Sequence, residues 1–520
     1  MDYSHLSLRE KIFKTFIVTI REINTHGGPE EFFRKYPVGG MYYSEAKPLY
    51  DAQGLEIGTA TTYEMLNRCK AASQERLWVV ADGAAAKNQK NTWRPTQSIG
   101  ASRNLEDAYN LGKIIGMQMN DKGIDCVLGP CIDMYLSEFI YIGATVDDPD
   151  LTAKIYRQMI RGIQSQGVCA TAKHFPGMGT HFMNMHMSPG ENILPFDRWM
   201  ETYGYTYQEM IKEGVMSVMT THTTLRSYDN EGSDGYYPIA TYSKKLTTDL
   251  LKEELGFPGC VITDALIMGG MATGDLIAET VQAFKAGADH LLWPPVEAAE
   301  AIEQAILNGE IPMSRLEDAL ERIGRLEDFR LHALAHHQYE DPDPAFIDKE
   351  ILEMTERGIC CLRNKISLLP VSADKYHRIL IVDATQNSSH SSELLRDALQ
   401  KRGMQVEIQR DIYDVPSRVC WQADIDKLQS NYDLVIFNFH AEFLSEWGVP
   451  HMLIWASHLF DKKKKLIVNY GSPYFAVNYF PEDPTIIEMN CSPSEETVEM
   501  LAAGILGEKE FTGKTVLLHR

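Results

Sequence analysis

The chain has 520 residues, 44% of them hydrophobic and 23% charged, as in soluble globular proteins. Its length exceeds that of one ordinary domain, so we expect two. The net charge of −22 argues against nucleic acid or an anionic membrane as an electrostatic partner, and it is compatible with a neutral ligand.

Short apolar runs separated by helix-sized intervals fill the first 330 residues. Seven are predicted to be strands: 38–43, 77–82, 125–130, 169–175, 217–223, 259–265 and 290–294. Between them, stretches such as 105–123 and 275–288 have apolar residues at helical spacing. This alternation favours parallel pairing, and the number of strands indicates a TIM-like (β/α)8 barrel more than an open sheet.

A second unit is predicted further along the chain. The charged stretch 313–330 reads as a long helix, and 331–350 then contains two prolines and several acids. Strands are predicted at 377–384, 433–440, 465–470 and 485–490, which indicates a smaller αβα sandwich. We therefore expect a barrel domain over 1–335, a linker over 336–370 and an α/β domain over 371–520.

Polar side chains follow several of the predicted barrel strands. In a parallel barrel the carboxyl ends of the strands form one rim, where functional groups gather. The candidates selected by this rule are Asp82, Asp133, Lys173, His174, His222 and Asp264.

Asp264 has two interpretations. It stands after the β run of "GFPGCVITDALIMGG" and before small and apolar residues. Asp favours helix N-caps, so it is a candidate cap. It is equally a candidate carboxylate nucleophile, which needs a rigid position and nearby cations to stay ionised.

The stretch "KHFPGMGTHFMNMH" supplies such cations. Lys173 and His174 are adjacent at a strand end, and a buried ammonium is costly without an acceptor. They are candidates to donate to Asp264 or to substrate hydroxyls. The glycines that follow allow a loop to carry His186 towards the reacting centre.

The order of these motifs resembles glycoside hydrolase family 3, in particular its β-N-acetylglucosaminidase subgroup with a C-terminal α/β domain. The resemblance extends almost end to end. It rests on motifs that include "LWVVADGAAAKNQ", "TAKHFPGMGT", "LLKEELGFPGCVITDALIMGGM" and "RGICCLRNKISLLPV".

The resemblance implies retaining hydrolysis with Asp264 as nucleophile. In this subgroup the acid/base is a loop histidine paired with an aspartate two residues earlier. His186 stands at the histidine and Asn184 at the aspartate. An amide can orient an imidazole but adds no negative charge, so alternatives are a slower enzyme, a substrate with a good leaving group, or another acid such as His181 or Glu191.

The sugar-binding positions implied by the resemblance are only partly kept. Asp82, Asp133, Lys173, His174 and His222 are retained. Ala84, Ala85 and Ala86 replace an acid and paired glycines, Lys87 replaces an arginine, and a further arginine has no counterpart near Gly143 and Ala144. The sugar therefore need not be N-acetylglucosamine.

The leading hypothesis is an exo-acting retaining β-glycosidase with a carbohydrate substrate. The alternatives are a glycoside phosphorylase, a catalytically impaired sugar-binding relative and, least supported, a structural barrel that forms oligomers. His440 and Glu442 in the second unit are further candidate acids. We expect no cofactor and no metal, since no His/Cys cluster shows ligand spacing.

The cellular setting and partners are predicted from composition. The nine cysteines contain no C-x-x-C pair, which indicates a reducing compartment. The first 20 residues mix charges into their apolar residues, unlike a signal peptide or membrane span. We expect a cytoplasmic protein with no nucleic-acid or membrane partner, and a homo-oligomer stays open.

Overall fold

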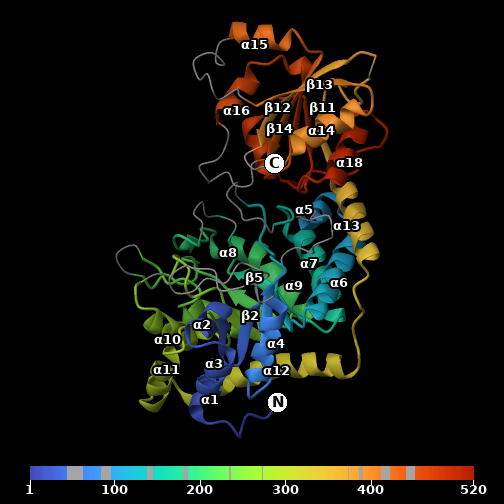
Figure 1. Ribbon diagram of the computed structural model, residues 1–520. Coiled ribbons are helices and arrows are strands. Elements are labelled where there is room, and N and C mark those ends of the chain that lie inside the picture. Colours follow the sequence, from blue (N-terminus) through green and yellow to red (C-terminus); the bar gives the residue numbers. More distant parts are fainter. Residues whose placement is uncertain are drawn as a thin grey trace. The chain divides into compact units, whose positions relative to one another are not determined.

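The computed structural model describes residues 1–43, 62–83, 95–136, 144–178, 180, 185–232, 236–271, 273–372, 374–385, 390–410, 422–440 and 451–519. The chain divides into two compact units, whose elements are labelled in Figure 1. Unit 1 comprises Met1–Ala84, Gly112–Asp133 and Tyr156–Pro342. Unit 2 comprises Ala85–Leu111, Met134–Ile155 and Asp343–Arg520.

Unit 1 is built on a parallel sheet. In the part of the chain that the structure describes, this sheet has eight strands in the order β10-β1-β2-β3-β4-β5-β7-β9. A parallel bridge between Ile262 and His290 joins the two ends of this order. The sheet thus closes on itself, and the predicted TIM-like barrel is confirmed. The strands are β1 (Phe16–Thr19), β2 (Gly40–Tyr43), β3 (Trp78–Asp82), β4 (Cys126–Leu128), β5 (Cys169–Phe175), β7 (Ser217–Thr220), β9 (Cys260–Thr263) and β10 (Leu291–Leu292).

Two strand predictions need correction. Strand β1 was missed, because its four residues lie in a short stretch between two helices, which end at Phe13 and begin at Ile20. The run predicted at 217–223 is β7 followed by the separate strand β8 (Thr223–Thr224), which pairs with β6 (Gly190–Glu191).

Helices connect the barrel strands. Those between residues 1 and 165 are α1 (Leu8–Phe13), α2 (Ile20–Thr25), α3 (Pro29–Lys35), α4 (Thr62–Ala72), α6 (Leu105–Asp121) and α7 (Pro149–Ser165). Later ones are α8 (Phe196–Trp199), η1 (Met200–Gly204), α9 (Tyr205–Glu213), η2 (Lys245–Glu254), α10 (Leu276–Ala286), α11 (Ala298–Leu307) and α12 (Met313–Ala335). Helices α6 and α7 have residues in both units.

The barrel interior is filled by alternate residues of the strands. Because strand side chains alternate between faces, Trp78 and Val80 of β3 and Cys260 and Ile262 of β9 belong to the same buried cluster. Burial of this apolar surface is a main source of barrel stability.

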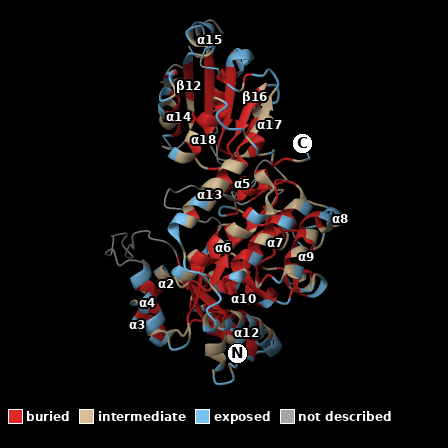
Figure 2. Ribbon diagram, turned by 90° about the vertical axis from the view of Figure 1, so that its right-hand side faces the viewer, coloured by how far each residue is buried: buried red, intermediate tan, exposed pale blue. Residues whose placement is uncertain are grey.

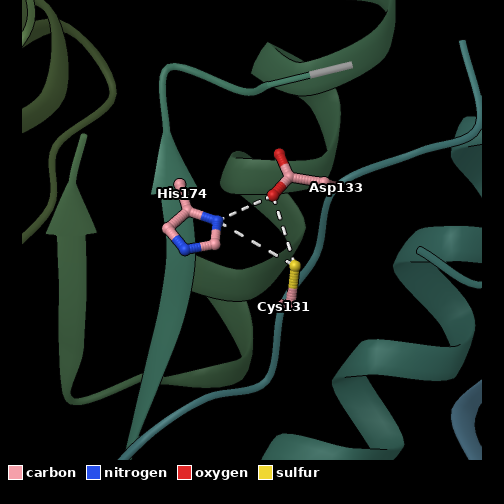
Figure 3. Close-up of side chains that lie close together, drawn as sticks. All are labelled: Cys131, Asp133 and His174. Carbon is pink, nitrogen blue, oxygen red and sulfur yellow. Dashed lines mark hydrogen bonds and ion pairs between the residues drawn. The ribbon is translucent and has the colours of Figure 1, made fainter. Parts of the chain in front are cut away.

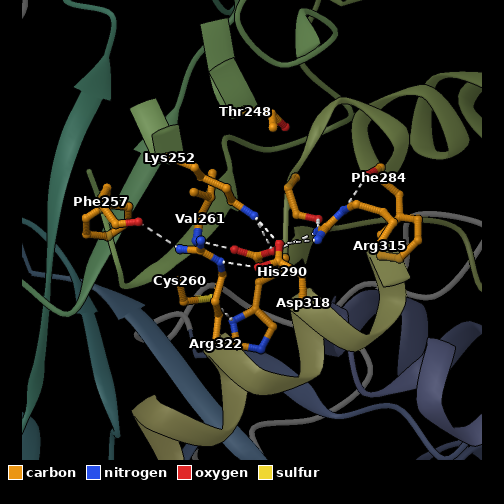
Figure 4. A network of polar contacts seen from close by, with 12 residues as sticks. Thr248, Lys252, Phe257, Cys260, Val261, Phe284, His290, Arg315, Asp318 and Arg322 are labelled. Carbon is orange, nitrogen blue, oxygen red and sulfur yellow. Dashed lines mark hydrogen bonds and ion pairs between the residues drawn. The ribbon is translucent and has the colours of Figure 1, made fainter. Parts of the chain in front are cut away.

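A buried network of ion pairs connects elements around the segment that precedes β10 (Figure 4). The Asp289 carboxylate, which is fully buried, accepts from Lys252 Nζ at 2.7 Å and from an Arg315 guanidinium nitrogen at 2.7 Å. Its second oxygen accepts from the backbone N–H of Val261 at 2.8 Å. Asp289 therefore ties η2 and α12 to strand β9.

Unit 2 contains a six-stranded sheet in the described ranges, with the order β11-β16-β15-β14-β12-β13. Only β11 runs antiparallel to its neighbour. The strands are β11 (Cys360–Asn364), β12 (Arg378–Thr385), β13 (Gln405–Gln409), β14 (Leu434–His440), β15 (Lys465–Asn469) and β16 (Thr485–Glu488). The helices are α5 (Pro95–Ser102), α13 (Pro344–Gly358), α14 (Ser391–Gln400), α15 (Gln422–Gln429), α16 (His451–His458), η4 (Lys462–Lys464), α17 (Pro473–Tyr479) and α18 (Glu495–Ile505).

The sheet of unit 2 is covered on both faces, as the predicted sandwich requires. Ile379 and Ile381 of β12 pack in one core cluster, whereas Leu380 and Val382 pack in another. Figure 2 accordingly colours β12 and β16 as buried. Strands β11 and β13 were not predicted, and the region expected to be a linker, 336–370, contains α13 and β11.

Candidate active site

Three charged side chains have the inward orientation at the carboxyl ends of barrel strands. Asp82 continues the inward series of Trp78 and Val80, and Asp264 continues that of Cys260 and Ile262. Lys173 follows Cys169 of the same cluster at the same parity in β5. Alternation alone therefore brings these groups to one end of the barrel.

Asp264 is not a helix cap. Helix α10 begins at Leu276, and its N-cap is Asp275, whose side chain accepts from Ala278 N. Asp264 is partly buried, with one carboxylate oxygen accepting from Ala265 N at 2.8 Å and the other from Thr221 Oγ1 at 3.3 Å. Each carboxylate oxygen can accept a further hydrogen bond beyond the one from Ala265 N or Thr221.

Lys173 is a buried cation beside two carboxylates. Its Nζ lies 2.8 Å from Asp82 Oδ1, and Tyr42 OH donates to Asp82 Oδ2 at 2.9 Å. Burial alone would lower the pKa of Lys173, but the negative charges of Asp82 and Asp264 outweigh it and raise this pKa. Desolvation opposes ionisation of Asp82, yet Lys173 and Tyr42 lower its pKa overall. The site thus keeps an ammonium and a carboxylate at neutral pH.

His174 is held by Asp133 (Figure 3). Its Nδ1 lies 2.8 Å from Asp133 Oδ2, and the Cys131 thiol donates to the same oxygen at 3.2 Å. The other Asp133 oxygen accepts from Met178 N at 2.8 Å. Asp133 is fully buried, and its contacts with His174, Cys131 and Met178 hold its carboxylate in place.

His222 is enclosed in the protein and faces Ala265. Its Nε2 lies 3.1 Å from the Ala265 carbonyl oxygen, and its Nδ1 lies 2.9 Å from Thr241 Oγ1. Burial lowers the pKa of His222, although Asp264 opposes this shift. A neutral ring that donates from Nε2 and accepts at Nδ1 satisfies both contacts.

The C-terminal part of the loop that contains His186 is hydrogen-bonded to the segment after Asp264. Gly269 N donates to the His186 carbonyl at 2.9 Å, and Gly270 N donates to that of Met185 at 3.1 Å. The His186 side chain is exposed. Asn184, its expected partner, and the alternative acid His181 lie outside the described residues.

The other acid candidates are placed as follows. Glu191 forms an ion pair with Arg226 at 2.8 Å and accepts a second hydrogen bond from it at 3.1 Å, so both of its oxygens have a cationic donor. His440 ends β14 of unit 2 and is buried. Glu442, Gly143 and 84–87 lie outside the described residues, whereas Ala144 is buried.

An aromatic pair adjoins the charged groups and was missed by the sequence analysis. The rings of Tyr42 and Trp293 are 5.2 Å apart and nearly perpendicular. Trp293 follows β10 with a φ of 63°, a left-handed conformation uncommon for a side chain of this size. The strand-end rule was applied only to polar residues, although Tyr42 and Trp293 stood at the ends of two predicted strands.

A family model decides what kind of protein this is. The family model described as "Glycosyl hydrolase family 3 N terminal domain" matches residues 30–326, more than half of the chain. The chain belongs to glycosyl hydrolase family 3. This glycoside hydrolase is also 24% identical over 448 residues to the "Beta-N-acetylglucosaminidase/beta-glucosidase" of Cellulomonas fimi, covering 80% of this chain and 78% of the relative.

Two solved structures share the whole fold of this family 3 protein. A β-glucoside phosphorylase superposes with a TM-score of 0.80 at 23% identity, covering 98% of this chain and 94% of that one. A family 3 β-N-acetylglucosaminidase from Paenibacillus sp. strain FPU-7 superposes with a TM-score of 0.79 at 20% identity, covering 98% and 99%. At these identities the likeness establishes the fold alone.

Two further observations concern the cellular setting. Every cysteine in the described ranges is a free thiol. Among the helices of those ranges, none combines the length and the apolar character needed to cross a bilayer.

Proposed function

We propose that this family 3 protein is an exo-acting retaining β-glycosidase that cleaves a terminal sugar through a glycosyl-enzyme on Asp264. The observation that carries the proposal is the position of this carboxylate, at the end of β9 and close enough to the Lys173 ammonium to raise its pKa. A carboxylate nucleophile needs a fixed position beside the sugar-binding groups. Thr221 and Ala265 N hold the carboxylate in one orientation.

The sugar would be held by both hydrogen-bond donors and an acceptor. Lys173 and His174 bind hydroxyls, and Asp82 accepts from another hydroxyl while its 56% exposed side chain stays paired with Lys173. Asp133 acts as a positioning residue, because its hydrogen bond fixes the His174 ring. His222 likewise positions the backbone at Ala265 and does not bind the sugar itself.

The aromatic pair supports a pyranose substrate. Tyr42 connects the pair to Asp82 through its hydroxyl, so a ring bound to Asp82 has an apolar surface nearby. Aromatic side chains pack well against apolar faces of ligands. Relatives with names such as β-N-acetylglucosaminidase/β-glucosidase and β-hexosaminidase favour a β-linked glucose or N-acetylglucosamine unit.

His186 is the proposed proton donor to the leaving oxygen. Asn184 stands where the family resemblance places an aspartate, and an amide supplies no negative charge. Loss of such an orienting carboxylate costs on the order of 10⁴-fold in a serine-protease triad. We therefore expect efficient cleavage only of substrates whose leaving group needs little protonation.

A glycoside phosphorylase is the second candidate, favoured by the likeness to a β-glucoside phosphorylase structure. Phosphate could attack the glycosyl-enzyme without activation by a base, which suits a weakened acid/base pair. An impaired sugar-binding relative is the third. A cytoplasmic location remains part of the proposal, supported by the free thiols.

A panel of aryl β-glycosides tests these alternatives. We expect rapid turnover of activated aryl glycosides, slow turnover of alkyl glycosides, and loss of both in Asp264→Asn. Retention of the anomeric configuration in the first product, followed by NMR, would support the glycosyl-enzyme. Equal rates on both classes would show that His186 is not the limiting acid. A sugar 1-phosphate formed only with added phosphate would favour the phosphorylase, and binding without turnover would favour the impaired relative.

A further inference from the structure

Cys131, Asp133 and His174 bring three metal-ligating atoms together where the segment after β4 lies beside the end of β5 (Figure 3). The Cys131 Sγ, a carboxylate oxygen of Asp133 and a ring nitrogen of His174 lie within 4.8 Å of one another. All three residues are buried. We propose that this triad is a binding site for a thiophilic divalent cation, best matched by Zn²⁺, and that its occupancy inhibits the enzyme.

The present distances are close to those that Zn²⁺ requires. Bonds of about 2.3 Å to sulfur and about 2.0–2.2 Å to nitrogen and oxygen place tetrahedral donors roughly 3.3–3.6 Å apart. Here the separations are 3.2 Å from Cys131 Sγ to Asp133 Oδ2, 2.8 Å from that oxygen to His174 Nδ1, and 4.0 Å from Sγ to Nδ1. Each differs from the required spacing by about half an ångström or less.

The backbone holds the ligands in register. A parallel bridge pairs Cys131 with Lys173, the residue before His174. Ile132 N donates to the Lys173 carbonyl at 2.7 Å, and Lys173 N donates to that of Pro130 at 3.2 Å. The sulfur and the imidazole therefore come from two segments fixed side by side, which lowers the cost of assembling a site.

The donor types select the cation. Sulfur, nitrogen and oxygen together suit Zn²⁺ or Co²⁺, whereas Mg²⁺ and Ca²⁺ prefer oxygen alone. Binding would release the Cys131 thiol proton to solvent, and the neutral His174 ring would carry its proton on Nε2 while Nδ1 binds the metal. One thiolate and one carboxylate then balance the two positive charges. Three protein ligands leave a fourth position for water.

Inhibition follows because the metal would replace the hydrogen bond to Asp133 that orients the His174 ring, so that His174 could no longer bind a sugar hydroxyl. This step rests on the proposed function.

Sequence analysis missed the triad because Asp133 and His174 are 41 residues apart in the chain, and only the pairing of neighbouring segments brings them together.

Co²⁺ titration of the full chain tests the site without reference to activity. We expect one equivalent of Co²⁺ to give a thiolate-to-cobalt absorption band that Zn²⁺ abolishes. The band should be lost in Cys131→Ser, which keeps a donor for Asp133, and in Cys131→Ala. It should persist in Cys126→Ser, a control at another buried barrel cysteine. Absence of the band in the wild type, or its persistence in Cys131→Ser, would overturn the proposal.

Activity assays separate the inhibition from the proposed function. With an aryl glycoside, we expect Zn²⁺ to inhibit the wild type and Cys126→Ser, and Cys131→Ser to need at least tenfold more Zn²⁺ for the same fractional loss of its own rate. An active enzyme that ignores Zn²⁺ would refute the inhibition and leave the glycosidase standing. A protein that binds Co²⁺ through Cys131 but cleaves no glycoside would refute the glycosidase and leave the site standing.

Discussion

Lys173 combines two properties that few lysines share, burial and a charged state. Its side chain is 9% exposed and its ammonium is paired with Asp82, whose own side chain is 56% exposed. Removal of the ammonium would leave Asp82 able to be hydrated, so the fold should tolerate the change better than the reaction does.

We predict that Lys173→Met lowers kcat/KM by about 10²–10³-fold, the range for loss of one preorganised electrostatic contact. Tyr42→Phe removes only the second hydrogen bond to Asp82 and should cost about tenfold. Steady-state kinetics on an activated aryl glycoside, with thermal denaturation as the fold control, measures both. Unchanged kcat/KM in Lys173→Met would exclude this residue from the site.

Glu488 is the clearest case of a perturbed acid outside the candidate site. It ends β16 almost fully buried, with no hydrogen-bond partner in the described part of the chain for either carboxylate oxygen. Burial raises its pKa to about 8, against a smaller opposing effect of Arg363. The folded state therefore holds a proton on Glu488 that the unfolded state releases near its ordinary pKa of 4.5.

This difference makes stability depend on pH. The contribution of neutral Glu488 is complete below the unfolded pKa and is lost as pH rises from there through the folded value, a change of roughly 5 kcal/mol by pH 9. We predict that the Tm of Glu488→Gln falls less than that of the wild type between pH 6 and pH 9. At pH 9 the Tm of the variant should be higher than that of the wild type. The exposed control Glu482→Gln should follow the wild-type curve. Parallel curves for wild type and Glu488→Gln would contradict the assigned shift.

At the scale of elements, the loop arm with His186 and the segment after Asp264 meet through glycines. A Cβ on Gly269 would lie 2.8 Å from the His186 carbonyl oxygen and 2.9 Å from that of Met187. Both neighbours are backbone atoms, so a side chain cannot be accommodated without moving the loop.

We predict that Gly269→Ala lowers kcat at least tenfold by displacing His186. The control Gly324→Ala lies in α12, where the nearest atoms to a new Cβ are 3.6 Å away. It should keep full activity and gain up to about 1 kcal/mol from helix propensity. Equal kcat in Gly269→Ala and the wild type would show that this contact does not position the proton donor.

Elements with strong periodicity were predictable from sequence, and those defined by their neighbours were not. The apolar run of β5 and the helical spacing of α6 were recognised near their observed bounds. Strand β1 lies between α1 and α2 without a turn signal to separate them, and the edge strand β13 has only two apolar residues, so pairing with neighbouring strands identifies both.

The same distinction applies to the site. The strand-end rule found Asp82, Lys173 and Asp264, because alternation along a strand is a local property. It could not reveal that Asp133 holds His174 or that Cys131 joins them, since those contacts depend on the pairing of β4 and β5.

At the scale of the whole molecule, unit 1 depends on charges buried away from the candidate site. Asp289 neutralises both Lys252 and Arg315 in the barrel network. We predict that Asp289→Asn lowers the free energy of unfolding by about 3–5 kcal/mol, because it leaves two cations underpaired.

Urea denaturation followed by tryptophan fluorescence measures this loss. The control Asp150→Asn removes an exposed pair with Lys154, in which both side chains are more than half exposed, and should change stability by less than about 1 kcal/mol. Equal effects of the two substitutions would show that the network contributes no more than a surface pair.

The central claim is that Asp264 forms a covalent bond with the sugar. Incubation with a 5-fluoro glycosyl fluoride, followed by proteolysis and mass spectrometry, tests it most directly. The account predicts one glycosyl adduct, on the peptide that contains Asp264, and none in Asp264→Asn. An adduct on another residue, or turnover that persists in Asp264→Asn, would contradict it.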